Sequence, residues 1–182
     1  ESAEAIISDD CQLLFVMPTV AREGRANYLN STLDALLCQL RSATHESLRV
    51  CIGVFEPRPQ AVTPTPFELA RRSLAKAPAN VRNRVLFVRA SDDASSSSSS
   101  QALRGTIRRA LKSADDAVSR LGKLGLTKRQ TVDVARMLLA FQSRSSRYLV
   151  LMEDDWLLCD GGMDALRYLI AKASLYHGAN NW

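Results

Sequence analysis

Four short runs of hydrophobic residues recur along the chain. They span residues 13–20, 48–56, 85–90 and 148–152. Continuous apolar runs of this length are typical of strands that are buried on both faces of a parallel sheet. We therefore predict a strand at each of the four places.

Between and after these runs, hydrophobic residues return every three or four positions, which is the period of an amphipathic helix. The period predicts helices over residues 28–40, 67–77, 127–144 and 163–178, with Thr127 as the N-cap of the third. Strands that alternate with helices predict an α/β fold with a mostly parallel sheet and helices on both faces. Ligands of such folds bind at the carboxyl ends of the strands.

Two stretches do not suit a core. Residues 56–66 are rich in proline, which predicts a loop, and residues 91–101 are rich in serine, which predicts a flexible loop. The remaining pattern fits one domain over residues 1–182. Because the chain starts with Glu1 and stops at Trp182 without a terminating element, we interpret it as a fragment, with a membrane anchor possible outside it.

Composition and charge narrow the function classes. Hydrophobic residues make up 46% of the chain, which is enough for one core, and the formal net charge is +5. The basic residues are not interleaved with aromatic ones, so the sequence predicts no nucleic-acid partner. No apolar run is long enough to cross a membrane.

The four cysteines are Cys11, Cys38, Cys51 and Cys159, and none has the spacing of a zinc site. Cys38 and Cys51 lie in apolar segments and are interpreted as buried thiols. If the chain is lumenal, one or two disulfides are the alternative, and the sequence leaves the pairing open.

Three carboxylates, Glu153, Asp154 and Asp155, follow directly after the fourth strand. Side chains alternate along a strand, so Glu153 and Asp155 are expected on one side and Asp154 on the other. Carboxylates this close repel unless a positive charge lies among them. A divalent cation that keeps positions open for phosphate oxygens is one answer, and helix capping or pairing with arginine is the other.

Several common enzyme classes lack their signatures. The chain has no glycine-rich phosphate loop of the kinase type, no dinucleotide-binding glycine pattern after the first strand and no nucleophile elbow. The only histidines, His45 and His177, lie in expected surface segments. The sequence therefore gives little support to nucleophilic catalysis that depends on histidine.

Three motifs and a closing tryptophan, in order, resemble the glycosyltransferase A (GT-A) fold and, more narrowly, the N-acetylglucosaminyltransferase IV family. The matching residues are Pro18, Thr19, Val20, Arg22 and Glu23; Arg129, Gln130 and Asp133; Tyr148, Glu153, Asp154 and Asp155; and Trp182. The resemblance implies that the chain is the nucleotide-sugar-binding half of such an enzyme.

The resemblance also implies an activity and a site. A sugar, N-acetylglucosamine in this family, would move from a UDP-sugar to a glycan acceptor on a glycoprotein or glycolipid, with Mn²⁺ or Mg²⁺, as in N-glycan branching. Asp155 would bind the metal, while Glu153 and Asp154 would contact the sugar or ribose and orient the ion. Pro18, Thr19 and Arg22 would lie along the nucleotide, and Gln130 would approach it from a helix N-terminus. The implied location is the Golgi or ER lumen, in a single-pass or multi-pass membrane protein.

Other interpretations remain open at this point. Residues 56–126 have no match in the family, and Trp156 stands where the family is expected to have an aliphatic or small residue. The catalytic base is expected beyond Trp182 and is not identified. The alternatives are transfer of N-acetylgalactosamine to a glycolipid anchor, a non-catalytic domain that binds a partner protein, and a different metal-using α/β enzyme such as a nucleotidyltransferase.

Overall fold

The structure is a computed structural model that describes residues 11–20, 28–42, 49–58, 64–90, 124–141 and 146–177. The strands are β1 (Leu13–Pro18), β2 (Val50–Glu56), β3 (Val85–Arg89) and β4 (Tyr148–Leu151). The helices are α1 (Tyr28–Ser42), α2 (Pro66–Leu74), α3 (Ala79–Arg82), α5 (Leu124–Phe141) and α6 (Gly162–His177). None of the helices within these ranges is both long and apolar enough to cross a membrane.

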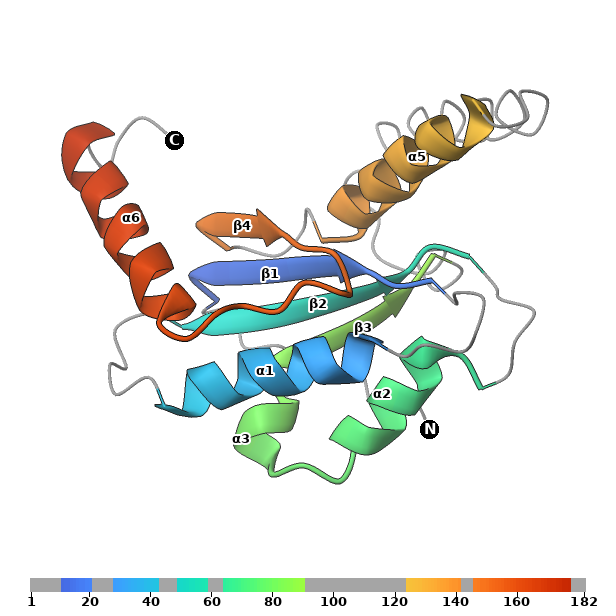
Figure 1. The fold of residues 1–182 in the computed structure, drawn as a ribbon, viewed down its shortest axis with the longest axis horizontal. Helices are drawn as coiled ribbons and strands as arrows, with labels where there is room; N and C mark the ends of the chain where they lie inside the picture. Colours follow the sequence, from blue (N-terminus) through green and yellow to red (C-terminus); the bar gives the residue numbers. More distant parts are fainter. Residues whose placement is uncertain are drawn as a thin grey trace, which may run out of the picture.

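The four strands form one all-parallel sheet in the order β3-β2-β1-β4 (Figure 1). From β1 to β3 the chain moves outward in one direction, and β4 then returns to the other side of β1. The strand order therefore reverses between β1 and β4. In doubly wound sheets the crevice beyond the carboxyl ends of the strands at this reversal is where ligands bind.

Alternate side chains of β1 enter two separate cores. Leu13, Phe15 and Met17 pack in a core that includes residues of α1, α2 and α6. Leu14 and Val16 pack on the other face, in a core that includes residues of α5. Helices thus cover both faces of the sheet, and the prediction of an α/β fold with a parallel sheet is confirmed.

Some predicted bounds are wrong. Helix α5 begins at Leu124, so Thr127 lies inside the helix and is not its N-cap. The short helix α3 was not predicted, because four residues are too few to show a period. The serine-rich stretch at residues 91–101 lies outside the described residues.

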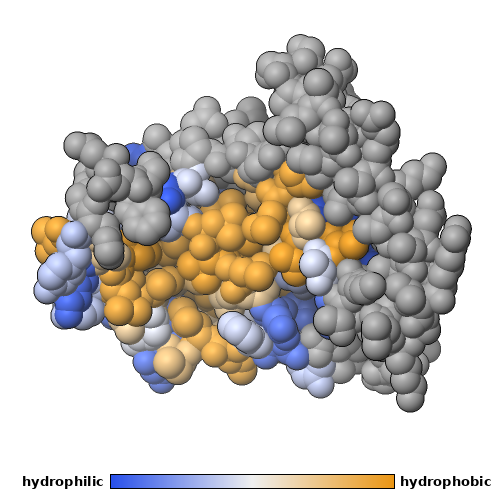
Figure 2. All heavy atoms as spheres, turned by 90° about the horizontal axis from the view of Figure 1, so that it is seen from above, coloured by the Kyte–Doolittle hydropathy of each residue, from blue (hydrophilic) through white to orange (hydrophobic). Residues whose placement is uncertain are grey.

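The prediction that the fourth strand is buried is also wrong. Leu149 and Leu151 of β4 are 42% and 45% exposed. The cause is the strand order, because β4 is the last strand of the described sheet and pairs only with β1. Seen from above the view of Figure 1, where β4 is the uppermost strand, the molecule shows a broad hydrophobic surface (Figure 2). Further exposed apolar residues lie on α6: Tyr168, Leu169, Leu175 and Tyr176.

A disulfide joins Cys11, just before β1, to Cys51 in β2, with the two Cα atoms 5.8 Å apart. The interpretation of Cys51 as a buried thiol is therefore wrong. The same interpretation of Cys38 is also wrong, because Cys38 is an exposed free thiol. Cys38 lies about half a turn from the buried Leu36 and Leu40, on the outer side of α1.

The middle of β2 has no room for a side chain at Gly53, so we expect glycine to be required there. A Cβ atom at this position would lie 2.6 Å from ring carbons of Phe141 in α5. We expect Gly53→Ala to lower the free energy of unfolding by about 1–3 kcal/mol through overpacking. Urea unfolding would measure this change, and adding Phe141→Leu should recover part of the loss. An unchanged unfolding midpoint in Gly53→Ala would contradict the packing described.

Candidate functional site

The three carboxylates lie in a turn at the carboxyl end of β4. The N–H of Met152 donates to the carbonyl oxygen of Val16 at 2.9 Å, which extends the pairing with β1 by one residue. The N–H of Trp156 then donates to the carbonyl oxygen of Glu153 at 3.3 Å. Glu153 and Asp155 are exposed, whereas Asp154 is only 5% exposed. The exposure of the three side chains alternates as predicted, but they lie in a turn and not in the strand.

Thr19 connects this turn to the neighbouring strands. Thr19 is completely buried, and its N–H donates to the carbonyl oxygen of Phe55 at the end of β2, at 2.8 Å. Its hydroxyl donates to Oδ2 of Asp154 at 3.0 Å. The buried residue after Pro18 therefore holds the carboxyl ends of β1, β2 and β4 together, and two of the three motifs meet at one edge of the sheet.

Asp154 is held by its backbone as well as by its side chain. The hydroxyl of Thr32, a buried residue of α1, donates to the carbonyl oxygen of Asp154 at 2.8 Å. A buried carboxylate that accepts a hydrogen bond fixes the local chain, because breaking the contact leaves a buried polar group unpaired. In this arrangement Asp154 orders the turn, in which Glu153 and Asp155 are exposed residues.

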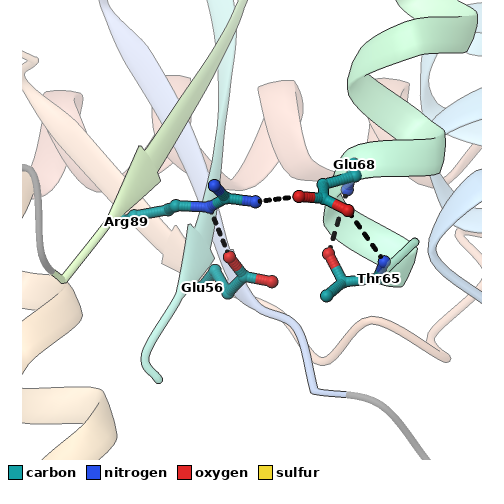
Figure 3. A network of polar contacts seen from close by, with 4 residues as sticks. All are labelled: Glu56, Thr65, Glu68 and Arg89. Carbon is teal, nitrogen blue, oxygen red and sulfur yellow. Dashed lines mark hydrogen bonds and ion pairs between the residues drawn. The ribbon is translucent and has the colours of Figure 1, made fainter. Parts of the chain in front are cut away.

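A second charged cluster lies at the carboxyl ends of β2 and β3 (Figure 3). Nε of Arg89 contacts Oε2 of Glu56 at 2.5 Å, and Nη2 of Arg89 contacts Oε1 of Glu68 at 2.9 Å. Glu68 also forms a capping box with Thr65 at the start of α2, with both hydrogen bonds at 3.2 Å. Arg89 thus ties β2 and β3 to the N-terminus of α2.

The Arg89 hydrogen bond lowers the pKa of Glu68 below its ordinary value of 4.5, and the Thr65 backbone N–H adds to this effect. Because the pKa is lower in the folded chain, the Glu68 contacts stabilise the fold above the unfolded-state pKa. This contribution is lost as the pH falls through the lowered, folded-state pKa.

Glu56 is a candidate functional residue that the sequence reasoning missed. The residue is 3% exposed, and its Oε1 has no hydrogen-bond partner within the part of the chain that the structure describes. A buried acceptor without a partner is costly, so such an atom in a native fold is a candidate for contact with a ligand donor. The sequence signal was a carboxylate that ends the hydrophobic run of β2, as Glu153 follows β4.

The remaining predicted residues differ in their placement. Arg22, Glu23 and Trp182 lie outside the described residues. Gln130 is an exposed residue near the start of α5. Both carboxylate oxygens of Asp133 accept from Nη2 of Arg58, at 2.8 and 2.9 Å. Asp133 therefore joins α5 to the segment after β2, which gives this motif residue a structural role.

Within the described ranges, no group of three or more His, Cys, Asp or Glu side chains could hold a metal ion. Mg²⁺ in a nucleotide site, however, is usually held by one or two carboxylates together with phosphate oxygens and water. Glu153 and Asp155 are exposed oxygen donors at the strand-order reversal, so these residues fit an ion of that kind.

Comparisons of the chain with protein-family models, curated proteins and solved structures find no match.

Proposed function

We propose that this chain is the donor-binding part of a metal-dependent glycosyltransferase with the GT-A fold, and that it binds a UDP-sugar. One observation carries the proposal. The acidic turn after β4 is fixed against Thr19 after β1, at the point where the strand order reverses. The two motifs are 135 positions apart in sequence, and an anion-bearing ligand at a parallel sheet is expected at this point.

The chemistry of the turn suits a diphosphate. A nucleoside diphosphate carries negative charge, and an exposed acidic turn repels it unless a divalent cation lies between them. Asp155 and Glu153 would hold Mn²⁺ or Mg²⁺, which supplies charge neutralisation for the diphosphate leaving group. Asp154 keeps the turn in place through Thr19 and Thr32. Pro18, Arg22 and Gln130 stay assigned to the nucleotide by the resemblance alone.

Glu56 supports uridine as the nucleoside. Its Oε1 is a buried acceptor on the strand beside β1, at the same edge of the sheet as Thr19. Uracil carries an N–H at N3 that such an oxygen accepts, whereas cytosine has an acceptor at that position. A carboxylate that faces N3 would favour UDP over CDP, because bringing two acceptors together leaves both unpaired, whereas one that faced N4 would accept from the cytosine amino group.

The disulfide between Cys11 and Cys51 supports a location in the secretory pathway, because disulfides persist in oxidising compartments such as the ER lumen. We accordingly propose the Golgi or ER lumen as the site of action. The proposed acceptor is a glycan, and the proposed donor sugar is N-acetylglucosamine, as the resemblance implies.

Nucleotide competition tests the proposal. With Mn²⁺ present, we expect UDP-N-acetylglucosamine and UDP to bind more tightly than CDP or nucleoside triphosphates. Tighter binding of a triphosphate would instead favour a nucleotidyltransferase. Unfolding curves of each sample would show that the protein is folded.

The variant Glu56→Gln sharpens the test of base selection. A glutamine amide accepts from N3–H of uracil through its oxygen and donates to N3 of cytosine through its nitrogen. We therefore expect the ratio of UDP to CDP affinity to fall by roughly tenfold, the equivalent of about one hydrogen bond. An unchanged ratio in a folded Glu56→Gln protein would contradict the assignment of Glu56.

A further inference from the structure

Helix α1 runs beside the whole segment that carries the acidic turn. The connection from β4 to α6 passes back along α1 (Figure 1). Two polar side chains of α1 contact it, Thr32 at one end and Gln39 at the other. They are seven positions apart, which is about two helical turns, so both lie on one side of the helix. The same side of α1 therefore meets the segment at both of its ends.

Gln39 uses its whole amide group on this segment. Its Nε2 donates to the carbonyl oxygens of Leu158 and Cys159, at 2.7 and 2.9 Å. Its Oε1 accepts from the N–H of Met163 in the first turn of α6, at 3.3 Å. One side chain thus fixes two carbonyl groups of a segment without regular secondary structure and one N–H group of the first turn of α6.

We infer that Thr32 and Gln39 are positioning residues that set where the Asp155 carboxylate stands. Asp155 lies between the two anchored points, directly after Asp154, whose backbone Thr32 holds. The stretch between the anchors carries exposed side chains, including Trp156 and Leu157, so apolar burial does little to order it. The hydrogen bonds from α1 therefore contribute to ordering it, at its start through Thr32 and at its end through Gln39. The inference rests on the proposed function in one respect, namely that the carboxylate binds a metal ion.

The chain offers matched variants for a test. Thr32→Val and Gln39→Leu remove the donors with little change in volume, and Thr32→Ser keeps the hydroxyl. Ser31→Ala is the control, because Ser31 is an exposed neighbour on the same helix. Two measurements apply to every protein: hydrogen exchange of the amides in residues 153–163, and Mn²⁺ affinity from the electron paramagnetic resonance signal of the free ion.

We expect Thr32→Val and Gln39→Leu to exchange these amides faster than the wild type. Their Mn²⁺ affinity should fall by roughly 10–100-fold, which is typical when residues that orient a metal ligand are lost. Thr32→Ser and Ser31→Ala should resemble the wild type in both measurements. If Thr32 had a purely structural role, Thr32→Val would lower the thermal stability but leave the Mn²⁺ affinity of the folded protein unchanged.

Wild-type exchange rates and Mn²⁺ affinity in both Thr32→Val and Gln39→Leu would overturn the inference. If the folded wild type binds no Mn²⁺, the proposed function fails instead, and exchange of residues 153–163 alone then decides whether α1 positions the segment. Faster exchange in the two variants would support the positioning role, and unchanged exchange would overturn it.

Discussion

Asp155→Ala is expected to abolish Mn²⁺-dependent binding of UDP while the protein stays folded. Asp155 is exposed in the turn after β4, so its replacement by alanine opens no cavity in the core. Loss of a residue that orients a metal ligand lowers metal affinity by up to roughly 100-fold. If the Asp155 carboxylate binds the ion directly, the affinity for UDP in the presence of Mn²⁺ should fall by more than this. Calorimetric titration of UDP with Mn²⁺ present would measure the change.

Asp160→Ala is the matched control for this prediction. Asp160 is another exposed carboxylate, five positions further along the same connection and next to the positive-φ Gly161. We expect its replacement to leave the UDP affinity unchanged, because an exposed carboxylate that does not bind the ion acts only through its charge, which salt screens. Equal losses in both variants would mean that general charge, and not a metal ligand, determines the binding.

Removal of the disulfide is expected to have the largest effect on stability. Cys11 and Cys51 are 40 positions apart, and a cross-link that closes a loop of this size stabilises by about 4 kcal/mol through the unfolded state. We expect Cys11→Ala with Cys51→Ala to lower the free energy of unfolding by this amount. Both cysteines are buried, so alanine avoids placing a polar group in the core.

Cys38→Ala with Cys159→Ala is the control, since both are exposed free thiols. Surface changes of this kind should alter stability by no more than about 0.5 kcal/mol. Urea unfolding of both double variants, with and without a reducing agent, separates the two cases. A Cys11/Cys51 variant as stable as the oxidised wild type would show that this disulfide contributes little.

Much of the fold could be predicted from local sequence pattern. Val50–Glu56 is buried along its whole length, as its continuous apolar run predicts. The same pattern misled for β4, because burial there depends on how many strands pair with it. The strand order depends on the packing of the whole sheet, so the hydrophobic pattern of the four residues of β4 cannot predict it.

The candidate site was predictable in part for the same reason. The carboxylates could be placed after a strand, but the burial of Asp154 comes from its contacts with Thr19 and Thr32 in a turn and not from strand geometry. The contacts of Asp154 with Thr19 and Thr32 could not be predicted, because they join residues more than 120 positions apart. The ion pair between Asp133 and Arg58 could not be predicted either, because the two residues are 75 positions apart in sequence. Asp133, a residue of the second motif, therefore has a structural partner.

The most direct test of the central claim is calorimetric titration of UDP into the wild-type protein, first with Mn²⁺ and then with EDTA. Circular dichroism would first show that the protein is folded. We expect binding with Mn²⁺ and its loss with EDTA. A folded protein that binds no UDP when Mn²⁺ is present would contradict the proposal that the acidic turn beside Thr19 is a donor site.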